Sequence, residues 1–137
     1  TLCAILGGDA IFAALKEHLG VPNNGTTDDG KVTLEHIECN AACDYAPVVM
    51  VNWEFFDNQT VESAKELVDQ LRAGDLPTPT RGASLVTHVE TSRVLAGFPD
   101  GLVGEGPSAG PASVVGLQLA KERNETAPVV ARSKERP

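Results

Sequence analysis

The chain has 137 residues, of which 42% are hydrophobic, and this is enough for one domain with its own core. Its net charge is −8, and residues 1–76 hold 13 acidic against 4 basic side chains, which argues against nucleic-acid binding. The sequence lacks both an apolar run of about 18 residues and a basic-then-apolar leader, so we expect no membrane insertion and no signal peptide. We therefore expect a cytosolic chain whose three cysteines stay reduced.

The first element predicted is a helix that follows Cys3 and a Gly-Gly pair. Asp9 is a candidate N-cap, and Gly20 with Pro22 ends the segment. The apolar residues expected on one face are Ile11, Ala14, Leu15 and Leu19. A loop over 23–30 follows, and residues 31–38 are predicted as a strand that leads to Cys39.

A hairpin and a second helix are predicted after Cys43. The apolar run 48–51, a turn near Asn52 and a short strand through Phe56 favour a hairpin, with Trp53 in its packing. Thr60 is the expected N-cap of the helix that follows, and Gly74 its end. Its apolar face consists of Ala64, Leu67, Val68 and Leu71.

The composition changes after Gly74. Residues 97–116 are rich in glycine and proline, cannot form a core of their own, and contain no phosphate-binding glycine motif. We interpret them as a linker or an arm that lies along a partner, while 85–98 allows a short docking helix. Residues 117–137 hold 5 basic against 3 acidic side chains, a pattern typical of a solvated terminus.

The cysteines carry the strongest chemical signal. Three residues separate Cys39 from Cys43, which allows a turn with both sulfurs on one side, and 35 residues separate Cys3 from Cys39. A 2Fe-2S cluster usually needs four thiolates, one more than the three present. A zinc site with His36 as fourth ligand, a redox dithiol of Cys39 and Cys43, and buried structural cysteines are the alternatives.

Residues 1–3 with the helix that follows, and residues 38–52, resemble the thioredoxin-like 2Fe-2S ferredoxin family, which includes the E subunit of NADH-quinone oxidoreductase (respiratory complex I). The resemblance covers roughly residues 1–74. That family has a Cys-x4-Cys pair followed by Cys-x3-Cys, so Cys3 matches the second ligand, and Cys39 and Cys43 match the third and fourth. The resemblance places the first ligand five positions before Cys3, upstream of Thr1, so we expect that the chain lacks its native N-terminus.

The resemblance implies an α/β, thioredoxin-like fold with a long irregular C-terminal extension. It divides the chain into a 2Fe-2S domain over 1–74 and a partner-binding tail over 75–137. No residue is expected to be catalytic. Reduction would be made harder by Glu38 and Asp44, whose negative charges flank the ligands.

The resemblance also implies a function. The cluster would exchange electrons with the FMN of a neighbouring NADH-binding subunit, among other peripheral-arm subunits, on the cytoplasmic side of the bacterial plasma membrane. The alternatives are the equivalent subunit of an NAD-linked hydrogenase or formate dehydrogenase, or a non-redox zinc or interaction module.

Overall fold

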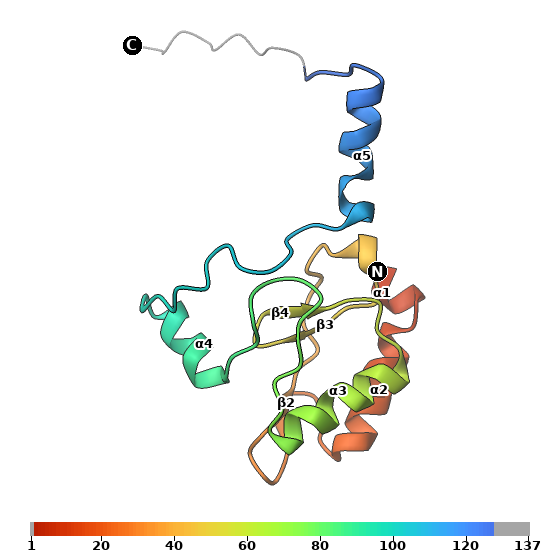
Figure 1. The fold of residues 1–137 in the computed structure, drawn as a ribbon. Helices are drawn as coiled ribbons and strands as arrows, with labels where there is room; N and C mark the ends of the chain where they lie inside the picture. The colour runs from red at the N-terminus through yellow and green to blue at the C-terminus, as the bar shows by residue number, and fades with distance from the viewer. Residues whose placement is uncertain (1, 128–137) are drawn as a thin grey trace, which may run out of the picture.

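The computed structural model describes residues 2–127, and Figure 1 shows their arrangement. The elements in chain order are α1 (Leu2–Ile5), α2 (Gly8–Leu19), β1 (Gly25–Thr26), β2 (Thr33–Leu34), the 3-10 turn η1 (Cys43–Tyr45), β3 (Val49–Val51), β4 (Glu54–Phe56), α3 (Val61–Ala73), α4 (His88–Leu95) and α5 (Pro111–Glu122). The described residues thus combine helices with two antiparallel two-stranded sheets, which makes the fold mixed α/β.

Helix α2 forms where the sequence predicts it, but the predicted N-cap is wrong. Gly7 precedes the helix in a left-handed conformation (φ 109°). Asp9 lies in the first turn, where its negative charge interacts favourably with the positive end of the helix dipole. Gly20 ends the helix with φ 69°, a conformation that glycine adopts without steric cost. The short helix α1 was not predicted.

Helix α3 confirms the predicted caps. The Thr60 hydroxyl accepts a hydrogen bond from the Ser63 amide (3.2 Å), and the Ser63 hydroxyl accepts one from the Thr60 amide (2.9 Å). This reciprocal capping box satisfies two backbone donors at the start of the helix. Gly74 closes the other end with φ 98°.

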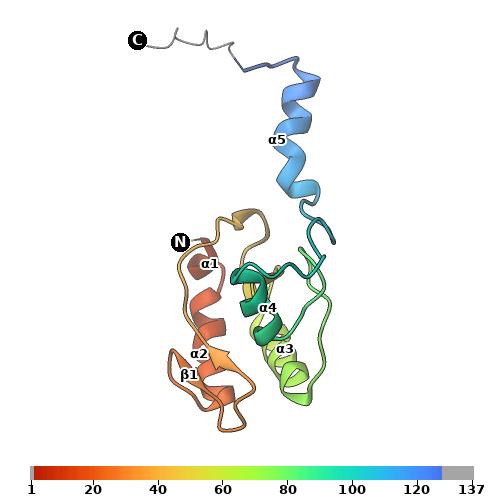
Figure 2. The same ribbon diagram turned by 90° about the vertical axis from the view of Figure 1, so that its left-hand side faces the viewer.

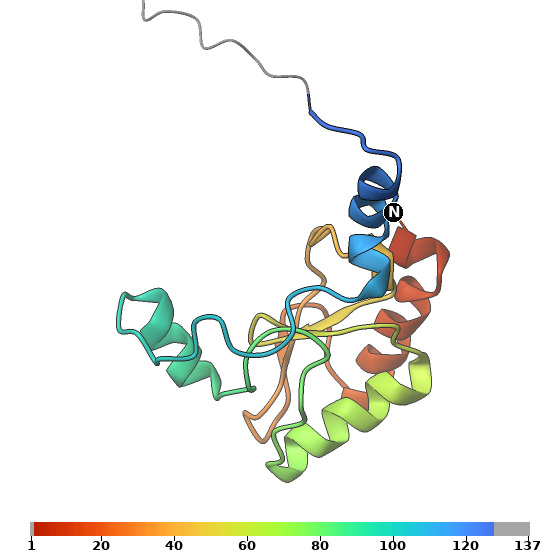
Figure 3. The same cartoon turned by 45° about the horizontal axis from the view of Figure 1, so that its top comes forward.

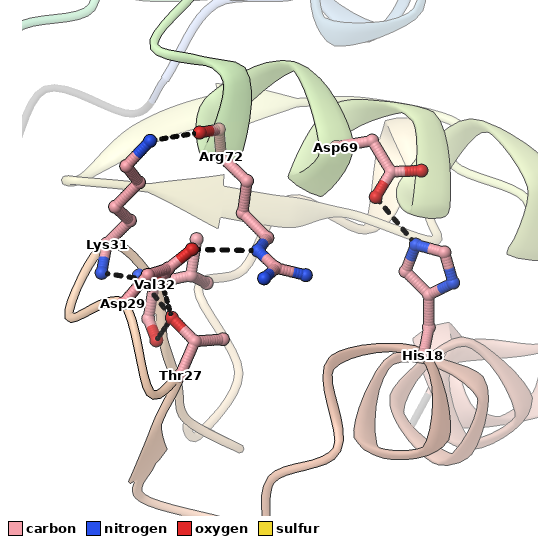
Figure 4. Close-up of polar contacts among 7 residues, drawn as sticks. All are labelled: His18, Thr27, Asp29, Lys31, Val32, Asp69 and Arg72. Carbon is pink, nitrogen blue, oxygen red and sulfur yellow. Dashed lines mark hydrogen bonds and ion pairs between the residues drawn. The ribbon is translucent and has the colours of Figure 1, made fainter.

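Helices α2 and α3 pack side by side and enclose the larger of two hydrophobic clusters (Figures 1 and 2). The buried members of this cluster are Ile11, Leu15, Leu19, Val21, Leu34, Ala64 and Val68. Polar contacts bridge the helices and the nearby loop, as Figure 4 shows: His18 contacts Asp69, and Arg72 contacts Asp29. Most of the two predicted apolar faces lies in this cluster. Leu67 and Leu71 of α3 instead pack in a second, smaller cluster.

The predicted strand over 31–38 is wrong in extent. Only Thr33–Leu34 is a strand, paired with Gly25–Thr26. Beyond Leu34 the chain leaves the pairing: residues 35–40 are exposed, and the His36 amide donates to the side chain of Asn23 (2.8 Å). β-Branched residues form a strand only where a neighbouring strand pairs with them. The pairing with β1 ends at Leu34, so the strand ends there too.

The hairpin of β3 and β4 is confirmed. Val49 pairs with Phe56, and Asn52 and Trp53 form the turn with φ values of 49° and 76°. Two left-handed residues match the twist of a two-residue hairpin turn. The Trp53 side chain is 59% exposed, so its expected packing in the hairpin core is wrong.

Part of the extension beyond Gly74 lies against the hairpin. Phe55 forms a β-bridge with Arg81, and Leu85 is buried in a second cluster with Phe56 and Leu67. Helix α4 falls within 85–98, where a helix was allowed, and lies across the hairpin from α2 (Figures 1 and 3).

Helix α5 was not predicted. It begins with Pro111 after Gly110, inside the segment 97–116 that was interpreted as a linker. Proline at the first helical position has no amide to leave unpaired, so it favours a helix start there. The helix projects away from the domain (Figures 1 and 2). Of the basic segment 117–137, residues 128–137 lie outside the described part of the chain.

Within residues 2–127, the structure has no helix that is both long and apolar enough to cross a bilayer.

Candidate metal centre

Cys3 lies in α1 and is partly buried. The start of α2 approaches it closely: a Cβ atom at Gly8 would lie only 2.9 Å from the carbonyl oxygen of Cys3. Only glycine therefore fits at this position without a shift of the backbone. The Gly-Gly pair thus brings the N-terminus of α2 up to the cysteine.

Cys39 lies in the loop between β2 and η1 and is exposed. The backbone amide of Ala41 donates a hydrogen bond to its sulfur, with an N···S distance of 3.3 Å. Ala41 has φ 57°, a left-handed conformation that residues other than glycine, asparagine and aspartate rarely adopt. Amide donors to sulfur stabilise a thiolate and are one of the means by which proteins tune a bound iron-sulfur cluster.

Cys43 is the first residue of η1 and is exposed. The two residues after it connect the turn to α5: Asp44 accepts a hydrogen bond from the Ser113 hydroxyl, and the Tyr45 hydroxyl accepts one from the amide of Ala112 (3.3 Å). Figures 1 and 2 show this turn at the same end of the domain as α1, with the start of α5 close by. The segments that carry Cys3 and Cys43 therefore lie at the same end of the domain.

All three cysteines are free thiols. Among residues 2–127, no group of three or more His, Cys, Asp or Glu side chains converges closely enough to hold a metal ion. The donor set nevertheless fits an iron-sulfur centre in its chemistry, since it offers unpaired thiols and an amide that already donates to one sulfur. The three ligands remain a prediction.

His36, the fourth ligand of the zinc alternative, contacts other residues. Its ring lies against that of Phe12, with 4.9 Å between centroids and a 55° tilt. Its backbone amide is bound to Asn23. Through these contacts His36 packs between α2 and the start of the 23–30 loop.

Next to the Cys43 turn lies a buried ion pair that the sequence did not reveal. Arg81 donates two hydrogen bonds to Asp57, and the guanidinium also lies over the rings of Tyr45 and Phe55. The hydrogen bonds from Arg81 to Asp57 raise the pKa of the guanidinium above its usual value. Arg81 and Asp57 are 24 positions apart, and neither lies in a recognisable motif, so no sequence signal pairs them.

Comparison with known proteins assigns the class of this domain. Residues 1–72 match the family described as Thioredoxin-like [2Fe-2S] ferredoxin. The chain belongs to this family, which confirms the predicted fold class and the resemblance.

The chain is also similar to individual named proteins. The chain is 63% identical over 129 residues to the E subunit of NADH-quinone oxidoreductase from Mycobacterium tuberculosis, covering 93% of this chain and 51% of that protein. It is 39% identical over 72 residues to the protein of the same name from Rickettsia bellii, covering 53% and 43%. Over 72 residues it is 38% identical to NADH dehydrogenase [ubiquinone] flavoprotein 2, mitochondrial, from Dictyostelium discoideum, covering 53% and 29%.

The chain spans about half the length of the mycobacterial relatives that it matches. The match to the mycobacterial protein covers 93% of the chain, so it extends beyond the family domain into the C-terminal extension.

Proposed function

We propose that this chain carries a 2Fe-2S cluster and serves as an electron-transfer subunit of an NADH-quinone oxidoreductase. The observation that carries the proposal is the family match over residues 1–72, because this range contains all three cysteines. The names of the relatives support the same assignment.

In this proposal Cys3, Cys39 and Cys43 are ligands of the cluster, and the fourth ligand is a cysteine upstream of Thr1. When bound, the cluster accepts and releases single electrons. The chain's own residues hold the thiolates, and the Ala41 amide stabilises negative charge on the Cys39 sulfur.

Two carboxylates next to the ligands set the local charge. Glu38 and Asp44 flank the Cys39–Cys43 loop, and both residues are exposed. Their negative charge opposes the addition of an electron, although solvent weakens the effect. Replacing both with amides is expected to raise the reduction potential, with a smaller shift at high ionic strength.

The electron partner in this proposal is the FMN of a neighbouring NADH-binding subunit, in a peripheral arm on the cytoplasmic side of the bacterial plasma membrane. The chain itself carries out no hydride transfer. Residues 75–137 are the proposed partner-binding tail. Support comes from the exposed apolar residues of α5, namely Val115, Leu117 and Leu119, because a helix that leaves such side chains in water gains stability when a partner covers them.

The deciding experiment is anaerobic expression with the residues that precede Thr1, followed by iron and sulfide analysis and EPR of the dithionite-reduced protein. About two irons and two sulfides per chain with an S = 1/2 signal is the expected result. Replacing each of Cys3, Cys39 and Cys43 with serine, one at a time, should lower the cluster content or change the EPR spectrum. A colourless protein that carries zinc or no metal would contradict the proposal.

A control addresses the zinc alternative. His36→Ala should leave the iron content unchanged, because the imidazole packs on Phe12 and is not a proposed ligand. Loss of metal in this variant together with loss in the cysteine variants would point instead to a zinc site formed by the three cysteines and His36.

The partner proposal has its own test. Replacing Val115, Leu117 and Leu119 with serine should weaken co-purification with the flavin-bearing subunit while the iron content stays that of the wild type. Unchanged co-purification would remove α5 from the interface.

A further inference from the structure

We propose that Arg81, in the C-terminal extension, is the positioning residue for the turn that carries Cys43. This inference rests on the proposed function for what the turn holds, a cluster ligand. The geometry that supports it concerns residues that the chain itself places together.

The side chain of Arg81 is fixed in orientation. Its Nε donates to Asp57 Oδ2 at 2.8 Å, and its second terminal nitrogen donates to Oδ1 at 2.7 Å. The two side chains are only 15% and 7% exposed. Two parallel hydrogen bonds determine the plane of the guanidinium as well as its position.

That plane contacts two aromatic rings from different segments. The guanidinium carbon lies 4.7 Å from the ring centroid of Phe55, in β4, and 5.2 Å from that of Tyr45, in η1. Both distances are within the range of cation–π attraction. Arg81 therefore connects the turn to the hairpin.

Tyr45 transmits this restraint to the cysteine. It is the last residue of η1, two positions after Cys43. Its carbonyl accepts a hydrogen bond from the amide of Asn58 (2.9 Å), and its hydroxyl accepts one from Ala112 (3.3 Å). With ring, carbonyl and hydroxyl all bound, little freedom is left for the backbone at Cys43.

The backbone of Arg81 is held independently of the turn. The Thr80 amide donates to the Phe55 carbonyl (2.8 Å), and the Thr80 hydroxyl accepts from the Asp57 amide (2.9 Å). The Arg81 carbonyl itself accepts a hydrogen bond from the Phe55 amide (3.4 Å), so the backbone of Arg81 is bound to the hairpin and not to the turn.

Variants can separate the effect of the Arg81 charge from its effect on the position of the turn, because Asp57 neutralises Arg81. Arg81→Gln removes the ring contact and leaves Asp57 as an uncompensated buried charge. The double variant D57N/R81Q removes the same contact without a change in net charge. Arg81→Lys keeps a cation for Asp57 but lacks the planar fork. The matched control is Arg72→Gln, which removes another Arg–Asp pair (3.2 Å) between α3 and the 23–30 loop.

The first measurement is hydrogen exchange at the amides of Tyr45 and Asn58 in the full chain, which does not require a cluster. We expect exchange about tenfold faster in R81Q and in D57N/R81Q, an intermediate effect in R81K, and wild-type rates in R72Q. Wild-type exchange in the double variant would overturn the proposal. If R81Q does not fold, the double variant and R81K still decide, since neither leaves an unpaired buried charge.

The second measurement is the EPR spectrum and midpoint potential of the reduced, cluster-loaded protein. A change of g values in the double variant, with no change in R72Q, is the result expected of a residue that positions a ligand. R81Q should also shift the potential to more negative values, because it exposes the cluster to the charge of Asp57. An unchanged spectrum and potential in R81Q and in D57N/R81Q would contradict the inference. If the wild type binds no iron, the proposed function fails, while the exchange rates still decide whether Arg81 positions the turn.

Discussion

The Nε2 atom of His18 lies 2.7 Å from Oδ1 of Asp69, and this contact joins α2 to α3 (Figure 4). His18 lies in the last turn of α2. Its partner lies 51 positions away, on a helix that the hydrophobic core brings alongside. The contact is thus a consequence of helix packing.

Breaking this contact should have a small effect on stability. The two side chains are 30% and 57% exposed, so Asp69→Ala should lower the free energy of unfolding by about 0.5–1 kcal/mol. Asp69→Asn keeps an acceptor oxygen and should lose less. Urea denaturation with an unchanged m-value measures both. A loss of several kcal/mol in D69A would mean that the contact supports more than the helix pair.

Asp29 should contribute to acid sensitivity. Hydrogen bonds from the Thr27 hydroxyl and the Lys31 amide, together with Arg72, lower the pKa of Asp29 from 3.8 to about 2. A lowered folded-state pKa contributes stability that is fully present above pH 3.8 and is lost as the pH falls towards 2.

The variant Asp29→Asn should therefore be less stable than the wild type at neutral pH, and the two urea midpoints should converge as the pH falls to about 2. Asp28→Asn, at the neighbouring position, is the matched control, because it makes the same change in net charge. A constant gap between D29N and the wild type from neutral pH down to about 2 would contradict the assignment.

Leu85 tests whether the start of the extension is part of the folded domain. It is 5% exposed and packs with Phe56 and Leu67, so Leu85→Ala should destabilise the domain by about 2–4 kcal/mol. Leu76→Ala, in the same extension but at a side chain that is 55% exposed, should change stability by less than about 0.5 kcal/mol. Thermal unfolding followed by circular dichroism measures both. Equal, small effects would mean that residues after 74 do not contribute to the core.

Trp53 occupies a backbone conformation that suits glycine. At φ 76° a side chain with a Cβ is strained, so Trp53→Gly should be more stable than Trp53→Ala by about 1 kcal/mol. Comparing two variants that both lack the indole isolates the backbone term. Chemical denaturation gives the difference, and a more stable alanine variant would show that the turn relaxes.

The helices α2 and α3 and the hairpin were predictable because their signals are local: apolar periodicity, Thr60 and Gly74 at the ends of one helix, and a turn at Asn52. Helix α5 was missed because glycine and proline dominate the segment before it, and Pro111 is favourable only at the first helical position.

The surroundings of the cysteines were less predictable. Their positions in the sequence identify the family, but the amide that donates to Cys39 depends on the left-handed conformation of Ala41, which composition does not encode. The contact of Arg81 with Tyr45 links residues that are brought together only by the hairpin. Long-range pairing of this kind requires the tertiary structure.

The hydrogen bond from Ser113 to Asp44 has a thermodynamic consequence. It joins the first turn of α5 to the residue next to Cys43, so a partner that moves α5 also acts on the surroundings of that cysteine. Linkage between two sites is reciprocal. If docking at α5 shifts the reduction potential of a cluster held by Cys43, then reduction must change the affinity for the partner by the corresponding factor, and the strength of docking would depend on redox state.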